Sequence, residues 1–153
     1  MREILFRGKR AKNKEWIYGS VLVERDYPGT VIVTKENHNV VTKADVYYFD
    51  VIPETVGQYT GLTDKKGARI FEGDILKMSF GKDTLYATVN FGEYNQPDKI
   101  LRSHLGFYFD FVNTDNCESF RKDVGYWTGR TFLEIEVIGN IHDNPELLER
   151  GAK

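Results

Sequence analysis

Apolar and polar residues alternate in steps of two through much of the second half of this chain. Four segments follow this pattern and place large apolar side chains on one face: Leu76–Phe80, Leu85–Phe91, Phe107–Phe111 and Leu133–Val137. Successive side chains of a β-strand point to opposite faces of the sheet, whereas a helix repeats about every 3.6 residues. The alternation therefore predicts a half-buried β-sheet whose core consists of these apolar side chains.

The stretch Val56–Leu76, just before this region, is divided by glycines into short hydrophobic pieces. The glycines are Gly57, Gly61, Gly67 and Gly73. Glycine adopts positive φ without steric cost, so we expect tight turns at Asp64–Gly67 and Glu72–Asp74. The stretch predicts short β-strands joined by reversals of the chain.

The first part of the chain predicts a meander of short strands. Runs rich in β-branched and aromatic residues recur there: Ile4–Phe6, Trp16–Val23, Val31–Val33, His38–Thr42 and Val46–Val51. The Pro28-Gly29 pair is typical of a turn, so we expect Val31–Val33 to return beside Trp16–Val23 as a hairpin partner.

The end of the chain predicts a short helix. Asn144 is a suitable N-cap, Pro145 fits the first helical position, and Leu147 and Leu148 follow. Because so short a helix is marginal alone, we expect the two leucines to dock on the sheet.

Together these patterns predict one mainly β domain over residues 1–153. We expect an N-terminal β-meander (1–52) packed on a second lobe (53–153), a partly open SH3-like barrel or sandwich with the short C-terminal helix. The polar stretches Gly92–Gly106 and Asn113–Gly125 are expected to be long loops, where variable function would be located.

Charge, cysteine content and hydrophobicity argue against several classes of protein. The chain has 153 residues and a formal net charge of −2, so its overall charge attracts it neither to nucleic acid nor to an anionic membrane. Its one cysteine, Cys117, cannot form an internal disulfide, and no Asn-x-Ser/Thr sequence is present. The N-terminus lacks the apolar stretch of a secretory signal, and no apolar run is long enough to span a membrane. We therefore expect a soluble, cytoplasmic protein.

Three blocks of sequence are shared with a known family: Arg2–Gly19 (REILFRGKRAKNKEWIYG), Pro53–Leu76 (PETVGQYTGLTDKKGARIFEGDIL) and Val137–Glu149 (VIGNIHDNPELLE). In these blocks and their order the chain resembles the YopX family, encoded by phages and prophages of Gram-positive bacteria. The resemblance spans essentially the whole chain, although Gly81–Gly129 matches only loosely. It implies a mainly β fold and an accessory role for a phage or prophage inside the bacterial host cell. It supplies no catalytic residues.

Motifs for common enzyme chemistry are absent from the sequence. No Gly-x-x-x-x-Gly-Lys-Ser/Thr or Gly-x-Gly-x-x-Gly loop is present, which excludes nucleotide hydrolysis by a P-loop. The histidines His38, His104 and His142 are far apart, and none belongs to a His-x-x-x-His pair. We therefore predict no catalytic residues, no metal site and no cofactor.

An enzymatic alternative nevertheless stays open. Asp143 follows His142, and a carboxylate can orient an imidazole, but a turn before the C-terminal helix explains this pair better. An acidic cluster could bind a divalent cation if its loops converged, although turn chemistry explains it more simply: Asp64, Glu72 and Asp74. The remaining enzyme hypothesis is a site assembled from distant residues, such as Asp74, His104 and His142.

A basic segment near the N-terminus indicates nucleic-acid binding as an alternative function. It combines charges for phosphates with aromatic faces for bases: Arg7, Lys9, Arg10, Lys12, Lys14, Trp16 and Tyr18. Solvated charge is the commoner explanation, and the two aromatic residues would share one face of a strand as core or interface. The segment Glu134–Glu149 contains five acidic residues and no Lys or Arg, so it could pair with the basic segment, within one chain or between copies.

The predicted function is binding without catalysis. Missing catalytic groups and abundant aromatics, ten Phe and nine Tyr, favour a protein-binding module that works through edge strands and aromatic loop residues. The expected partner is a protein, with a second copy of the chain in a homo-oligomer as one form of it. A nucleic-acid-binding module using the basic segment and an enzyme with a spatially assembled site are the alternatives.

Overall fold

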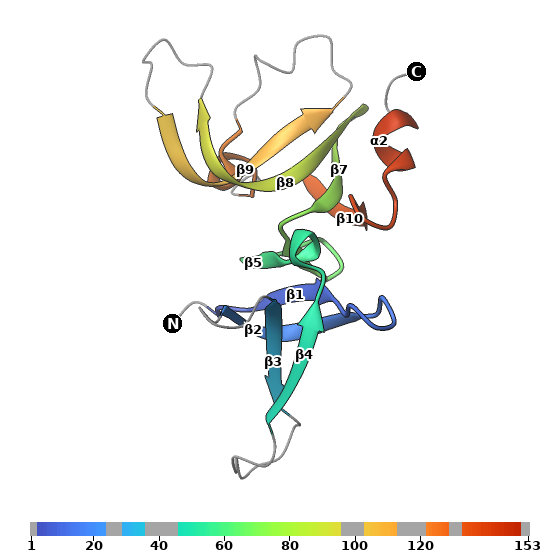
Figure 1. Cartoon of the computed structure of the whole chain (residues 1–153). Helices are drawn as coiled ribbons and strands as arrows, with labels where there is room; N and C mark the ends of the chain where they lie inside the picture. The colour runs from blue at the N-terminus through green and yellow to red at the C-terminus, as the bar shows by residue number, and fades with distance from the viewer. Residues whose placement is uncertain are drawn as a thin grey trace. The chain divides into compact units, whose positions relative to one another are not determined.

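The computed structural model of the protein describes residues 3–23, 29–35, 46–95, 103–112, 122–128 and 133–150. Antiparallel β-strands make up most of this backbone (Figure 1), so the prediction of a mainly β fold is confirmed. The chain divides into two compact units, Met1–Gly61 and Leu62–Lys153.

The first unit is an antiparallel meander. Its strands are β1 (Phe6–Lys9), β2 (Trp16–Val23), β3 (Thr30–Lys35), β4 (Val46–Val51) and β5 (Gly57–Thr63), with a short 3-10 helix, η2 (Pro53–Thr55), before β5. Their order is β4-β3-β2-β1-β5, and β5 runs across the boundary at Gly61 and pairs with β6 (Arg69–Phe71). β2 and β3 form the expected hairpin. The expected strand His38–Thr42 and the turn residue Pro28 lie outside the described residues.

Two glycines allow the strands of the first unit to approach closely. Gly8 in β1 and Gly19 in β2 lie on the face that covers Ile32, which is fully buried. A Cβ on Gly19 would collide with the carbonyl oxygen of Val33, and one on Gly8 would lie 3.0 Å from the Ile32 side chain. A side chain at either position would therefore push neighbouring strands apart.

The end of β4 returns to the end of β1. Arg10 and Val51 form an isolated antiparallel bridge. Beside it, the backbone N–H of Ala11 donates to the carbonyl of Asp50 at 2.9 Å. The turn between β1 and β2 is thereby attached to the outer edge of β4.

The second unit is built around a four-stranded antiparallel sheet. Its elements are β7 (Asp74–Phe80), β8 (Asp83–Asn95), β9 (Ser103–Val112), α1 (Val124–Thr128), β10 (Glu134–Asn140) and α2 (Glu146–Arg150), with sheet order β10-β7-β8-β9. The register places Leu76 opposite Ala87 and Val89 opposite Phe109. These four side chains are fully buried, and Trp127 of α1 packs on the same core. The predicted alternation is therefore confirmed as the core face of this sheet.

The SH3-like barrel expected for residues 53–153 is not observed, because the four-stranded sheet does not close among the strands that the structure describes. β9 and β10 form the two edges of the four-stranded sheet. The outer edge of β9 is instead followed by the segment before α1: Tyr108 and Asp123 form a bridge, and the Phe109 N–H donates to the Lys122 carbonyl at 2.8 Å. This pairing occupies part of the edge that closure would need.

The predicted loop Gly92–Gly106 is strand at both of its ends. Gly92 lies opposite Gly106, and Asn95 lies opposite Ser103. Both faces of this part of the hairpin are largely solvent-exposed, so its polar composition resembles that of a loop. The expectation was wrong there because strand pairing, rather than hydrophobic burial, defines the segment. Of the other expected loop, Asn113–Gly125, the described part leads into α1.

The C-terminal helix begins close to the expected place, but Asn144 has a different role. Its side-chain Oδ1 accepts a hydrogen bond from the backbone N–H of Asn140 at 3.4 Å, and its backbone carbonyl accepts one from Leu147 at 3.0 Å. A Cβ on Gly139 would come within 2.5 Å of the same Oδ1. The asparagine side chain thus folds back on the end of β10.

We expect Gly19→Ala to lower the free energy of unfolding by about 2 kcal/mol or more, because the new Cβ meets a backbone atom that cannot move without shifting β3. Urea unfolding followed by circular dichroism measures the change. Gly106→Ala is the control, since a Cβ there has no atom within 4 Å, and it should change stability by less than about 0.5 kcal/mol. Equal stability of the two variants would contradict this account of the first unit.

Candidate binding sites

The basic segment is divided between two faces of the β1–β2 hairpin. Arg7 lies opposite Tyr18 and Lys9 lies opposite Trp16, so these four side chains share one face. Arg10 lies on the other face, with its guanidinium carbon 4.4 Å from the centre of a β4 aromatic ring. The sequence predicted one basic site from these residues, but the structure places Arg10 on a different face from the other four.

The ring of Trp16 is covered by cations from its own sheet. The guanidinium carbon of Arg7 lies 4.7 Å from the ring centre and the Nζ atom of Lys9 lies 5.5 Å from it. Such cation–π contacts stabilise an aromatic ring from its face. Arg7 is only 7% exposed, whereas Tyr18 is 48% exposed. Arg7 and Trp16 thus stabilise the first unit, and Tyr18 is the more accessible aromatic residue.

The remaining cations of the segment lie in the turn between β1 and β2. Lys14 has a positive φ of 64°, and its Nζ donates to the Ala11 carbonyl at 3.3 Å. Nη1 of Arg10 lies 3.6 Å from a carboxylate oxygen of Glu15. Lys12 has no ion-pair partner within the part of the chain that the structure describes.

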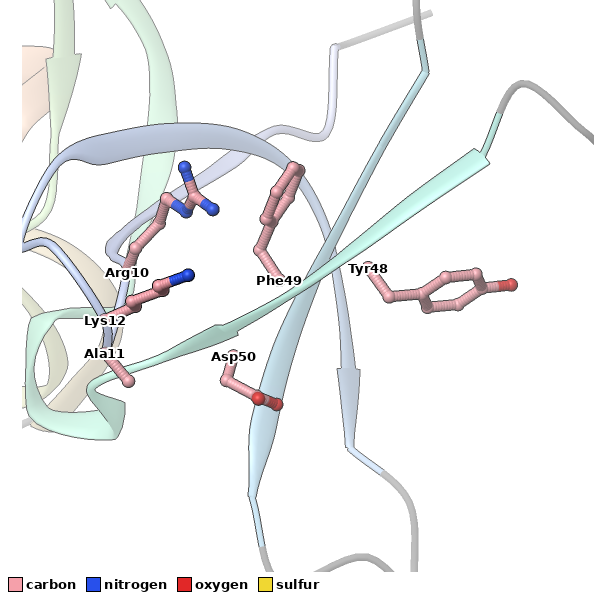
Figure 2. A pocket seen from close by; sticks show the side chains of 6 residues that line it. All are labelled: Arg10, Ala11, Lys12, Tyr48, Phe49 and Asp50. Carbon is pink, nitrogen blue, oxygen red and sulfur yellow. The ribbon is translucent and has the colours of Figure 1, made fainter.

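This turn and the edge of β4 together form a pocket of about 450 Å³ (Figure 2). Its lining residues are Arg10, Ala11, Lys12, Tyr48, Phe49 and Asp50. Arg10 and Lys12 lie on the Phe49 side of β4, while the ring of Tyr48 points away from Phe49. The site residues predicted from the sequence do not include Tyr48 or Phe49. The aromatic residues of β4 could have indicated a binding site. The sequence does not show, however, that β4 lies beside the basic turn between β1 and β2.

In the second unit, β8 extends well beyond its pairing with β7. The β7–β8 register ends with Ile75 opposite Thr88, and the N–H of Gly73 donates to the carbonyl of Val89 at 2.8 Å. Pairing with β9 continues as far as Asn95. Among the described residues, no strand pairs with the other side of β8 after Val89. We call this part of β8, Phe91–Asn95, the open edge.

The part of the hairpin that carries the open edge has aromatic residues on both faces. On the core side, the rings of Phe91 and Phe107 lie 5.1 Å apart, and Phe91 is 51% exposed. On the opposite side, the ring of Tyr94 stacks at 5.5 Å on His104 and at 5.0 Å on Tyr108. These aromatic pairs stabilise a two-stranded segment that lacks a third strand on the β7 side.

The residues of the enzyme hypothesis lie in different structural settings. Asp74 is 1% exposed, and its Oδ2 accepts the N–H of Phe71 at 2.7 Å. His104 lies on the exposed hairpin, and His142 lies in the turn after β10, where its backbone N–H donates to the side-chain Oδ1 of Asn140. Within the described ranges, no group of three or more His, Cys, Asp or Glu residues is arranged to bind a metal ion. The third histidine, His38, lies outside those ranges.

Asp64 stabilises the turn between β5 and β6 and its attachment to β10. Its Oδ1 accepts the N–H groups of Lys66 and Ala68, both at 2.8 Å, and its Oδ2 accepts the N–H of Val137 at 3.1 Å. Burial alone raises the pKa of this carboxyl, but these three N–H groups and the charge of Lys66 lower it by more. The pKa of Asp64 therefore lies below that of an ordinary aspartate.

Two glutamates of the acidic segment Glu134–Glu149 form ion pairs within the second unit. Nζ of Lys65 lies 2.9 Å from Glu134 and 3.4 Å from Glu136, and Lys66 pairs with Glu136 as well. The hydrogen bond to Glu134 raises the pKa of Lys65, and the bond from Lys66 lowers the pKa of Glu136. These two glutamates thus pair with lysines of the β5–β6 turn and not with the basic segment near the N-terminus.

We expect Asp64→Asn to lower the free energy of unfolding at pH 7 by about 2 kcal/mol, because bonds to a charged acceptor are lost. A depressed pKa contributes stability above the ordinary aspartate pKa of about 4, and this contribution disappears as the pH falls through the lowered value. The difference from the wild type should therefore shrink in acid. Urea unfolding across a pH series measures it. Asp83→Asn, at an exposed position, removes the same charge and should change the free energy of unfolding at pH 7 by less than about 0.5 kcal/mol.

The fold defines a class of antiparallel β proteins made of two compact units. The model of the YopX protein family matches residues 5–149, and the chain therefore belongs to the YopX family. Among solved structures it is similar to protein EF1440 from Enterococcus faecalis, with 22% sequence identity and a TM-score of 0.52, over 97% of this chain and 99% of that chain. The curated proteins contain no match. The likeness to the Enterococcus protein shows the fold.

Helices in the described ranges are short. None has the length and hydrophobicity that crossing a membrane would require.

Proposed function

We propose that this chain is a non-enzymatic phage or prophage accessory protein that binds a partner protein by adding an extended segment of the partner to the open edge of β8. The open edge supports the proposal: β8 continues to Asn95, whereas its pairing with β7 ends at Thr88. Strand addition to an exposed sheet edge is a common mode of peptide recognition. The phage setting rests on the family resemblance.

The backbone of the open edge has the geometry that strand addition needs. In an antiparallel ladder the N–H and C=O groups of alternate residues point to the same side. Since the carbonyl of Val89 bonds to Gly73 on the β7 side, the backbone groups of Phe91 and Glu93 point to that side too. An added strand would therefore lie in line with β7, beyond Gly73. Its main-chain hydrogen bonds would supply affinity without regard to sequence.

The side chains beside the open edge supply specificity. Phe91 is 51% exposed and Leu105 is 78% exposed, so an apolar side chain of the partner gains contact on that face. On the opposite face Gly92 leaves space, since a Cβ there would have no atom within 4 Å. The segment that fits has an apolar residue facing Phe91 and a larger side chain above Gly92.

The charge of Glu93 favours a different protein over a second copy of this chain. Glu93 lies in the middle of the open edge and is exposed. Two copies paired antiparallel there would bring their Glu93 side chains near each other, and like charges across a sheet are destabilising. A Lys or Arg in the partner strand would pair with Glu93 instead. The proposed partner segment therefore has an apolar residue opposite Phe91 and a positive charge opposite Glu93, two positions away on the same face.

Peptides selected from a random display library on the immobilised full-length protein provide the test. We expect them to carry an apolar residue two positions away from a Lys or Arg, because Phe91 and Glu93 lie on the same face of β8. Glu93→Pro should weaken their binding about fivefold or more, because it removes an edge N–H. Glu93→Ala, which keeps that N–H, should weaken it less. Proline is tolerated on a strand edge, so β8–β9 pairing should survive, and circular dichroism checks it. Equal binding to wild type and Glu93→Pro would refute the proposed edge.

Size-exclusion chromatography with light scattering distinguishes the occupant. A monomer is expected for the wild type, since the Glu93 charges oppose self-pairing. A dimer that Glu93→Pro converts to a monomer would assign the open edge to a second copy of the chain instead of a different protein.

A further inference from the structure

We propose that the pocket beside β4 binds single-stranded nucleic acid, with one phosphate between Arg10 and Lys12 and a base stacked on Tyr48. The site lies entirely in the first unit and is independent of the open edge of β8. It includes two cations of the basic segment and adds an aromatic residue from β4.

The two cations of the pocket are available to an anion in complementary ways. The guanidinium of Arg10 lies over the ring of Phe49, at 4.4 Å from its centre, and its Nη1 lies 3.6 Å from the Glu15 carboxylate, so its N–H groups can donate to an anion that competes with Glu15. The ammonium group of Lys12 has no ion-pair partner in the described part of the chain, and Figure 2 shows it directed toward Phe49. A phosphate between them would receive a planar donor from one side and a point charge from the other.

The edge of β4 adds a backbone donor at the same place. The Asp50 carbonyl accepts the Ala11 N–H, so the backbone groups of Asp50 point toward the turn. By the alternation of a strand, the N–H and C=O of Tyr48 point to that side as well. Within the described ranges no strand pairs with Tyr48 there. Its N–H is therefore placed to donate to a phosphate oxygen in the pocket.

The exposed tyrosine rings near the pocket favour a nucleic acid over an acidic peptide as the ligand. The ring of Tyr48 is 64% exposed and points away from Phe49, so one of its faces can accept a base. Tyr18, 48% exposed, offers a second ring in the same unit. Carboxylates alone would use the cations but would gain nothing from these rings. Glu15 and Asp50 oppose any anion at the pocket, so binding should be weak and salt-sensitive.

Fluorescence anisotropy with a labelled oligothymidylate and a labelled oligouridylate, each of about twelve nucleotides, tests the site on the full-length protein. We expect binding at low salt whose logarithm falls linearly with the logarithm of salt concentration. Lys12→Gln should weaken binding and reduce the salt slope by about 0.7, the contribution of one phosphate contact on a single strand. Tyr48→Ala should weaken binding about fivefold or more through lost stacking.

Matched controls separate this site from general charge effects. Lys82→Gln removes one exposed lysine in the turn before β8, so it changes the net charge as Lys12→Gln does, and it should leave binding unchanged. Equal loss in both lysine variants, or no binding of either oligonucleotide at low salt, would overturn the proposal. Equally tight binding of duplex DNA would exclude base stacking. Equal competition by polyglutamate of the same length would assign the pocket to an acidic protein segment instead.

Discussion

Burial of one face of the β10-β7-β8-β9 sheet is the constraint on which the second unit depends. The register places Leu76, Ala87, Val89 and Phe109 on that face, and all four are fully buried. A shift of one residue would turn the whole set to solvent, so the pairing of each strand is fixed. With β7 and β8 in this register, the greater length of β8 leaves its far end paired on one side only. The open edge is thus a consequence of the core and needs no special sequence of its own.

The core face could be predicted from the sequence because a two-residue period has few explanations. Phe107–Phe111 and Leu85–Phe91 each present every second side chain to one face, and both are strands. The continuation of the hairpin through Gly92 could not be predicted in this way. Its residues are exposed on both faces, so pairing with β9 leaves no hydrophobic period. Closure of the expected barrel is not observed among the described strands, and the sequence pattern of each strand does not specify whether the edges of the sheet meet.

The pocket beside β4 could not be predicted from the sequence. It depends on the hydrogen bond from Ala11 to Asp50, which joins segments far apart in the chain. The turn chemistry of Asp64 could be anticipated, but the same carboxylate was also a candidate metal ligand. What decides between these roles is the identity of the groups that bond to its oxygens. The carboxylate oxygens of Asp64 accept hydrogen bonds from the backbone N–H groups of Lys66, Ala68 and Val137. The sequence does not show that Val137, which is distant in the chain, is one of the donors.

The facing pair Gly92 and Gly106 has a consequence for how the hairpin adapts. This rung of the ladder has no side chain on either strand, so no cross-strand contact locks its twist. The φ of Gly92 is 157°, a value that other residues rarely adopt. We therefore expect the backbone to bend more easily at Gly92 and Gly106 than in the packed core. This position separates the core from the aromatic end of the hairpin, which contains Tyr94 and His104. Such bending would let the end of the hairpin change its twist to pair with the proposed partner strand, while the packed core keeps its shape.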